Sequence, residues 1–215
     1  MLSLLLASFV TFFVAIDPVA MAPMFTTMTN GMTPEWRRKM AIKSIAIATG
    51  ILLAFAFGGA WLLEQIHVSI DAFRIAGGLL LFLIAVDMLF EKRSERREER
   101  AEQVAAEQAK HPGVQDDISV FPLAIPLISG PGAIASIMLF FAEHENLAER
   151  GIILLGVGAN LALCLIAFLA AGPLSKIMGE TVASMLTRIF GFLLAALAAQ
   201  FVVDGIRNVF GIAAG

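Results

Sequence analysis

Six apolar segments divide this chain, and each is long enough to cross a lipid bilayer. They are Leu2–Met28, Ala41–Leu63, Ile70–Phe90, Ser119–Ala142, Gly151–Gly172 and Thr187–Phe210. A membrane-spanning α-helix needs about 20 predominantly apolar residues. Hydrophobic residues make up 59% of the chain and charged residues 15%, whereas soluble domains carry about 25% charged residues. The sequence therefore predicts an all-α membrane protein with six transmembrane helices.

Two of these segments contain a proline break near mid-depth. Asp17-Pro18 interrupts the first segment, and Ser129-Gly130-Pro131-Gly132 interrupts the fourth. Proline is favoured at the first position of a helix, directly after a capping residue such as Asp or Gly. Each break therefore predicts the beginning of a half-helix, with unpaired N–H groups and a partial positive charge. We expect the first and fourth helices to be broken at Pro18 and Pro131.

The two halves of the sequence resemble each other after a shift of 113 or 114 residues. Pro18 then aligns with Pro131, and Arg74-Ile75-x-Gly77 aligns with Arg188-Ile189-x-Gly191. Because each half contains three spans, the second half enters the membrane from the opposite side, which predicts two inverted three-helix repeats. Chance similarity among apolar helices is the alternative. The expected domains are a first three-helix repeat at 1–90, a charged cytoplasmic linker at 91–118 and a second three-helix repeat at 119–215.

Basic residues gather in the loops between spans 1 and 2, 3 and 4, and 5 and 6. With their flanks these loops hold Arg37, Arg38, Lys39, Lys43, Lys92, Arg93, Arg96, Arg97, Arg100, Lys110, Lys176 and Arg188. The other side holds Arg74, Arg150 and Arg207. Because cytoplasmic loops carry the excess of Lys and Arg, we expect a multi-pass cell (inner) membrane protein with both termini outside.

The linker repeats like charges every four residues, with glutamates at Glu91, Glu95 and Glu99. Such pairs repel in a helix by about 0.2–0.5 kcal/mol each. We interpret the segment as a solvated linker that is helical near the membrane; a regulatory or docking segment is the alternative.

The two breaks differ in charge, and this difference suggests a ligand. The Ser129–Gly132 break has no acidic residue and suits an anionic group such as a carboxylate, whereas Asp17 suits an ammonium group or a coupling cation. A small zwitterion would match both. The alternative for Asp17 is a cap that binds nothing, although a carboxylate at mid-depth is costly and usually functional. The candidate substrate-binding residues are Asp17, Pro18, Ser129, Gly130, Pro131, Gly132, Ser136, Asn160 and Gln200.

Other polar residues carry weaker signals. Asn160 and Gln200 have helix packing as their alternative. Charged residues near span ends are explained by snorkelling or ion pairing; they are Arg74, Asp87, Arg188 and Asp204. The sequence has no nucleophile–base set or metal cluster at one depth, so we expect neither an enzyme nor a bound cofactor, with a coupling proton or Na⁺ left open.

The motif at the first break reads Asp17-Pro18 with Pro23 downstream, and the motif at the second reads Pro122-Leu-Ala-Ile-Pro126-Leu-Ile-Ser-Gly130-Pro131-Gly132-Ala-Ile134. Both resemble motifs of the MarC family, which is also described as a small neutral amino acid transporter family. The resemblance covers essentially the whole chain. It implies an integral membrane protein that carries glycine, alanine and similar amino acids together with a coupling ion.

We therefore expect a secondary carrier for small neutral amino acids or similar metabolites, with the substrate held at mid-membrane between the two broken helices. Its expected partners are the lipid bilayer and this substrate, without nucleic acid, and homo-oligomerisation is left open. An ion or solute channel, with the half-helix ends as its constriction, is one alternative. A membrane scaffold or sensor that docks a partner through the linker is another.

Overall fold

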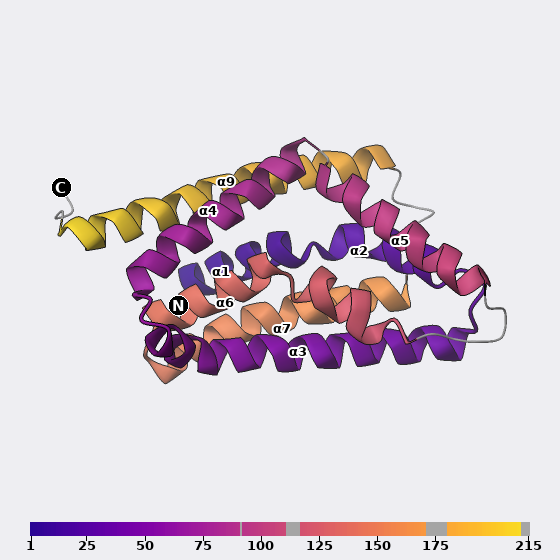
Figure 1. Ribbon diagram of the computed structural model, residues 1–215, viewed down its shortest axis with the longest axis horizontal. Helices are drawn as coiled ribbons and strands as arrows, with labels where there is room; N and C mark the ends of the chain where they lie inside the picture. Colours follow the sequence, from indigo (N-terminus) through magenta and orange to yellow (C-terminus); the bar gives the residue numbers. More distant parts are fainter. Residues whose placement is uncertain (91, 111–116, 171–179, 212–215) are drawn as a thin grey trace.

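The computed structural model describes residues 1–90, 92–110, 117–170 and 180–211. Every secondary-structure element in this part of the chain is a helix (Figure 1). In chain order the elements are α1 (Leu2–Ile16), α2 (Pro18–Met28), α3 (Pro34–Gln65), α4 (Ile70–Leu89), α5 (Lys92–Lys110), η1 (Ser119–Ile128), α6 (Pro131–Glu143), α7 (Leu147–Leu169) and α9 (Glu180–Phe210). Five helical stretches are long and apolar enough to cross a membrane, and a sixth is added if η1 and α6 are counted as one bent span. The prediction of an all-α, multispan membrane protein is therefore confirmed.

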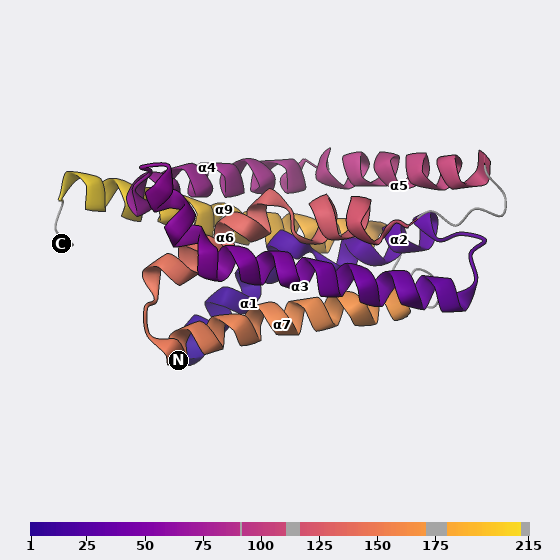
Figure 2. The same cartoon turned by 60° about the horizontal axis from the view of Figure 1, so that its bottom comes forward.

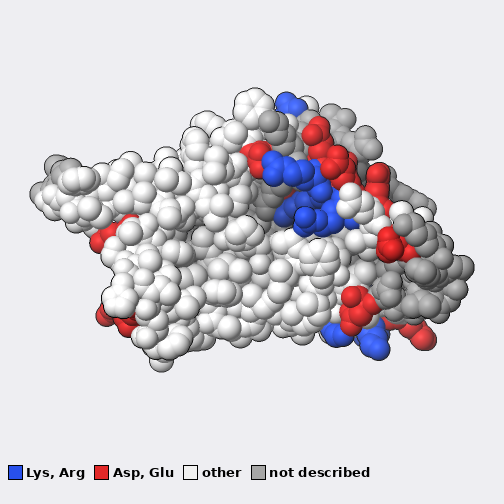
Figure 3. All heavy atoms as spheres, in the orientation of Figure 1, with Lys and Arg blue, Asp and Glu red and all other residues white. Residues whose placement is uncertain are grey.

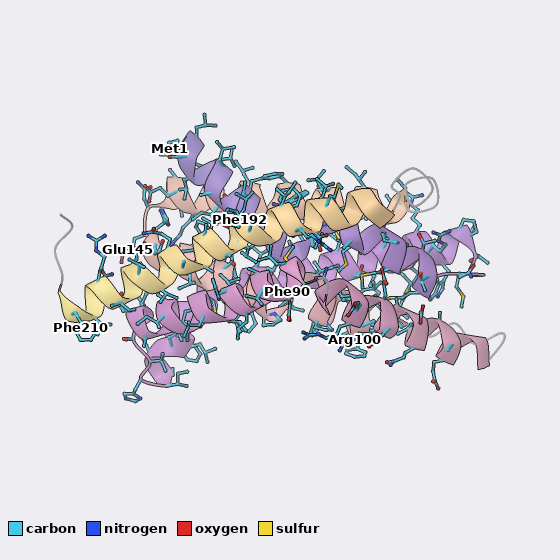
Figure 4. All side chains as sticks on the ribbon, turned by 90° about the horizontal axis from the view of Figure 1, so that it is seen from above. Met1, Phe90, Arg100, Glu145, Phe192 and Phe210 are labelled. Carbon is cyan, nitrogen blue, oxygen red and sulfur yellow. The ribbon has the colours of Figure 1, made fainter. Side chains whose placement is uncertain are left out.

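The helices form an elongated bundle in which α4 and α9 lie together along one side, while α3 and α7 lie together on another (Figures 1 and 2). The shorter pieces α1, α2, η1 and α6 lie within the bundle, and α5 packs against α2 and α4. Met1, Glu145 and Phe210 lie toward one end, and Arg100 of α5 lies toward the other (Figure 4). The chain thus begins at the end of the bundle where the described part of α9 ends.

The outer surface of the bundle is apolar, as a lipid-facing surface must be. Phe57, Trp61 and Phe192 expose 61%, 63% and 67% of their surface. Charged side chains gather in the half of the molecule where α5 lies, and the rest of the visible face carries few of them (Figure 3). This distribution agrees with the bias of basic residues in the sequence.

Aromatic contacts tie the short helices to the long ones. Phe25 of α2 stacks on Phe168 of α7 with ring centroids 4.5 Å apart. Phe12 of α1 lies 6.0 Å from Phe140 of α6. All four rings are buried, so the pieces on either side of Asp17 are anchored in different parts of the core.

Glycine lets several helices approach closely, which is how membrane helices pack without a hydrophobic driving force between them. A Cβ added at Gly78 of α4 would lie 2.9 Å from the carbonyl oxygen of Ala198 in α9. A Cβ added at Gly156 of α7 would lie 2.5 Å from Ser8 Oγ and 3.1 Å from the backbone nitrogen of Phe9 in α1. These contacts set the spacing of α4 against α9 and of α1 against α7.

Two prolines shape η1. Phe121 and Ile125 have extended backbone angles of φ −124°, ψ 127° and φ −122°, ψ 123°, because the residue before proline is excluded from the α region. Two hydrogen bonds of this segment join residues five apart in the sequence. Leu123 N–H donates to the Ile118 carbonyl oxygen, and Ser129 N–H donates to the Ala124 carbonyl oxygen. The segment meets α6 at a bend of 58°.

Asp117 anchors the beginning of η1. Its carboxylate accepts hydrogen bonds from the backbone N–H and the hydroxyl of Ser119 and pairs with the Lys43 ammonium of α3. The Lys43 and Ser119 contacts lower the pKa of Asp117 to about 2. Since a carboxylate with a depressed pKa stabilises the fold only while ionised, this contribution is present above pH 4 or so and is lost as the pH falls toward 2.

We predict that Gly156→Ala destabilises the protein by about 1–3 kcal/mol, the usual cost of overpacking. Its Cβ would collide with Ser8 and Phe9, whereas a Cβ at Gly158, on the same helix, meets nothing within 4 Å. Gly158→Ala is therefore the matched control and is expected to be neutral or slightly stabilising. Thermal unfolding of the two variants in detergent measures the difference, and equal melting temperatures would contradict the close packing of α1 and α7.

We also predict a pH dependence that Asp117→Asn removes. Between pH 5 and pH 2 the wild type loses a stabilisation that the variant lacks, so their melting temperatures converge as the pH falls. The Asp117 side chain is 46% exposed, and solvent screening therefore limits the difference at neutral pH to about 1 kcal/mol or less. A constant difference in melting temperature across this pH range would show that ionisation of Asp117 contributes nothing.

Candidate functional site

Asp17 separates α1 from α2. Its backbone adopts the left-handed conformation, with φ 60° and ψ 65°, a conformation that Asp tolerates better than most residues. Pro18 then occupies the first turn of α2, and the Asp17 carboxylate accepts a hydrogen bond from Ala20 N–H at 3.3 Å. The carboxylate therefore caps α2; that it also binds a ligand stays a prediction.

The second oxygen of the same carboxylate has a different partner. Arg97 Nη1 of α5 donates to Asp17 Oδ2 at 3.3 Å. Asp17 is 5% exposed and Arg97 8% exposed, so this is a buried ion pair. Burial lowers the pKa of Arg97, and the Asp17 charge opposes that change. A guanidinium remains protonated in proteins, so Arg97 brings a positive charge to the Asp17 carboxyl group.

The linker is therefore not fully solvated, in contrast to the expectation from its charges. Residues 92–110 form the helix α5, and Arg97 and Ala101, one turn apart, are both buried. Because repeated like charges destabilise an isolated helix, the contacts of α5 with α2 and α4 must supply much of its stability. Its position makes it part of the site.

Cys164 lies on α7, the helix that packs against α2, and its side chain is fully buried. It is also the single cysteine of the chain. Asp17 itself is engaged by α2 and α5.

The second break is packed against other helices. Ser129 Oγ donates to the Ala48 carbonyl oxygen of α3 at 3.3 Å, and Pro131 begins α6 after Gly130. A Cβ on Gly132 would lie 2.9 Å from Ile84 Cδ1 of α4. Ser129 and Gly132 are buried, so the beginning of α6 approaches α4 closely where the chain is glycine.

The two breaks contact different neighbours. The junctions of α1 with α2 and of η1 with α6 both lie near the middle of the long axis of the bundle (Figures 1 and 2). Asp17 is engaged by α5, whereas Ser129 is engaged by α3. That both helix beginnings face one polar chamber stays a prediction.

Asn160 joins α7 to α1. Its Nδ2 donates to the carbonyl oxygens of Phe9 at 3.0 Å and Gly156 at 2.9 Å, so it links helices as expected from the packing interpretation. Its Oδ1 is buried without a protein hydrogen-bond partner, as are Ser136 Oγ of α6 and Thr11 Oγ1 of α1. An unsatisfied buried polar atom costs about 1–3 kcal/mol. Ligand roles for Ser136 and Asn160 stay predictions.

The remaining polar candidates lie nearer the bundle surface. Gln200 is exposed on α9 and donates to Asp204 Oδ1 at 2.9 Å. Arg74 Nε lies 3.0 Å from Glu143 Oε1, which joins α4 to the end of α6. Arg96 pairs with Asp87 at 2.7 Å. Ion pairing near span ends is thus the arrangement observed for Arg74 and Asp87.

Sequence reasoning did not identify Arg97 and Thr11. A signal for Arg97 exists in the linker: Ala101, Val104 and Ala105 recur on the helical stripe that begins with Arg97, and residues three and four apart share a helix face. A short apolar stripe in a highly charged segment indicates a docked helix. Its basic residue is then placed to meet a buried carboxylate.

Comparison with known proteins identifies the family. Residues 2–210 match the family described as MarC family integral membrane protein. The chain is 35% identical over 201 residues to a UPF0056 membrane protein of Methanocaldococcus jannaschii, covering 94% of this chain and 95% of that protein. It is 31% identical over 210 residues to the UPF0056 membrane protein YvbG of Bacillus subtilis, covering 98% and 97%, and 32% identical over 202 residues to YhcE of Escherichia coli, covering 94% and 91%.

No solved structure matches this chain. The family match spans nearly the whole sequence, and the relatives are matched along nearly their full length. The apolar bundle described above is what such a match requires. The chain belongs to the MarC family of integral membrane proteins.

Proposed function

We propose that this protein is a secondary carrier for small neutral amino acids or similar small metabolites. The observation that supports this function best is Asp17, a carboxylate that is 5% exposed and lies in a break of the first span. An ionisable residue inside a membrane span is costly and usually functional. Broken helices near mid-membrane are a recurring feature of carriers, whose half-helix ends hold substrate and ions.

Asp17 is the group that faces the cationic part of the substrate or the coupling ion. In this structure a cation already lies there, because the Arg97 guanidinium is 3.3 Å from the carboxylate. The first turn of α6, after Ser129, Gly130 and Pro131, takes the carboxylate end of the substrate, since N–H groups at a helix beginning favour anions. Gly132 keeps side-chain bulk away from this turn.

In such a carrier the two halves of the chain are inverted repeats. Pro18 and Pro131 then begin half-helices that run toward opposite membrane faces. The basic end of the bundle faces the cytoplasm by the positive-inside bias, which puts the α5 side of the bundle toward the cytoplasm and both termini outside. Localisation in the cell (inner) membrane follows from the same bias.

We expect purified wild-type protein in proteoliposomes to show saturable glycine or alanine counterflow, and Asp17→Asn to lower its rate at least tenfold. Asparagine can still cap α2, so this substitution removes the charge and keeps the cap. Asp87→Asn is the matched control, because Asp87 pairs with Arg96 at the surface; its rate should stay within about twofold of wild type. Asp17→Asn/Arg97→Gln, which leaves no buried charge unpaired, should also fail to transport.

Other outcomes would favour the alternative functions. Conductance that does not saturate with solute concentration indicates a channel. Wild-type counterflow that Asp17→Asn leaves unchanged would remove Asp17 from the site. A thermal-shift screen gives an independent measurement, since a ligand at one hundred times its Kd adds about 2.7 kcal/mol of stability.

A further inference from the structure

The buried pair of Asp17 and Arg97 joins two parts of the chain that differ in how firmly they are held. Asp17 lies between α1 and α2, whose rings Phe12 and Phe25 are buried in the core. Arg97 lies on α5, where Arg97 and Ala101 are the buried residues among the side chains described, 95–107. Segments with few buried apolar contacts open at the lowest free energy. Arg97 is therefore the partner that can leave.

Removing Arg97 alone is unfavourable, because it leaves Asp17 as an unpaired buried charge. A cation that replaces Arg97 compensates the Asp17 carboxylate only. The displaced guanidinium must still find a partner or reach water. An anion alone likewise leaves Asp17 without a partner. A small zwitterion supplies both charges at once: its ammonium group can take Asp17 and its carboxylate can take the guanidinium.

We propose that the Asp17–Arg97 pair is a latch that holds α5 closed over the break, and that a small zwitterion opens it by exchanging with the pair. The trigger rests on the proposed function, whereas the latch itself rests on the ion pair and on the docking of α5. Arg97 thus acts as an internal substitute for the cationic group at Asp17, and α5 regulates access to this site from its own side of the membrane.

The chain contains its own reporter for this latch. Cys164 is the single cysteine, is fully buried and lies on α7, which packs against α2 beside the pair. Because a buried thiol reacts only when the surrounding packing opens, we expect its labelling rate to report the release of α5 from α2. Because there is one cysteine, each adduct detected by intact-mass spectrometry reports this residue.

The experiment measures the rate at which N-ethylmaleimide labels Cys164 in purified full-length protein. We expect Arg97→Gln to be labelled at least tenfold faster than wild type. Arg96→Gln is the matched control: it removes the same charge from the same helix, but its pair with Asp87 is exposed, with 65% of the Arg96 side chain accessible. It should be labelled within about twofold of the wild-type rate, because exposed pairs contribute little.

Asp17→Asn/Arg97→Gln separates the latch from general unfolding. This variant also lacks the ion pair but leaves no buried charge without a partner, so it should be labelled faster than wild type even where its stability is restored. Equal labelling of Arg97→Gln and wild type, equal acceleration by Arg96→Gln, or a double variant labelled at the wild-type rate would each overturn the latch.

The trigger is tested on wild-type protein with glycine as the probe. Saturating glycine should accelerate labelling, whereas methylammonium chloride or sodium acetate at the same concentration should not. Acceleration by either single ion overturns the exchange. Counterflow of glycine by the same preparation distinguishes the two proposals. If glycine counterflow is observed but Arg97→Gln is labelled at the wild-type rate, the latch is contradicted and the carrier function stands. If Arg97→Gln is labelled fast but glycine neither accelerates labelling nor shows counterflow, the carrier function and the zwitterion trigger are contradicted.

Discussion

The arrangement of this protein depends on where the Asp17 carboxylate finds a counter-ion. An ion transferred from water into a protein interior loses several kcal/mol of solvation unless a partner and further hydrogen bonds compensate. Ala20 N–H and the Arg97 guanidinium supply that compensation. Because Arg97 lies on α5, a charged helix outside the candidate spans is held against α2 and α4. One buried charge thereby couples the break in the first span to the segment that connects the two halves of the chain.

The parts that carry the breaks differ physically from the parts that surround them. The long helices approach one another through glycine, as α4 and α9 do at Gly78, and such contacts leave little room for displacement. The short pieces α2 and α6 begin at prolines, and in η1 the extended residues Phe121 and Ile125 interrupt the helix. Movement that alters access to the candidate site is easiest in α5, where two side chains are buried among those described at 95–107.

Hydropathy is sufficient to predict an all-helical chain with several membrane-spanning segments, because the apolar runs are long. An Asp-Pro or Gly-Pro pair in such a run predicts a helix beginning, and α2 and α6 begin at Pro18 and Pro131; that these breaks serve a site stays a prediction. The partners of polar side chains are harder to predict from the sequence, because they depend on how the helices are rotated and shifted against each other. Asn160 donates to Phe9, which is far away in sequence, and no local pattern specifies that contact. Arg97 was assigned to solvent because charge repeats dominate its segment, whereas the short apolar stripe beside it determines which face is buried.

The two breaks are unequal in charge, and this difference explains why Asp17 is paired with a cation of α5. A shift of 113 residues aligns Asp17 with Gly130, so the carboxylate of the first break has no counterpart in the second. The second break carries no charge that needs a counter-ion. Ser129 holds it to α3 by a hydrogen bond, and Gly132 lets it approach α4 closely. The first break needs a cation, and Arg97, on the segment between the two halves of the chain, supplies it.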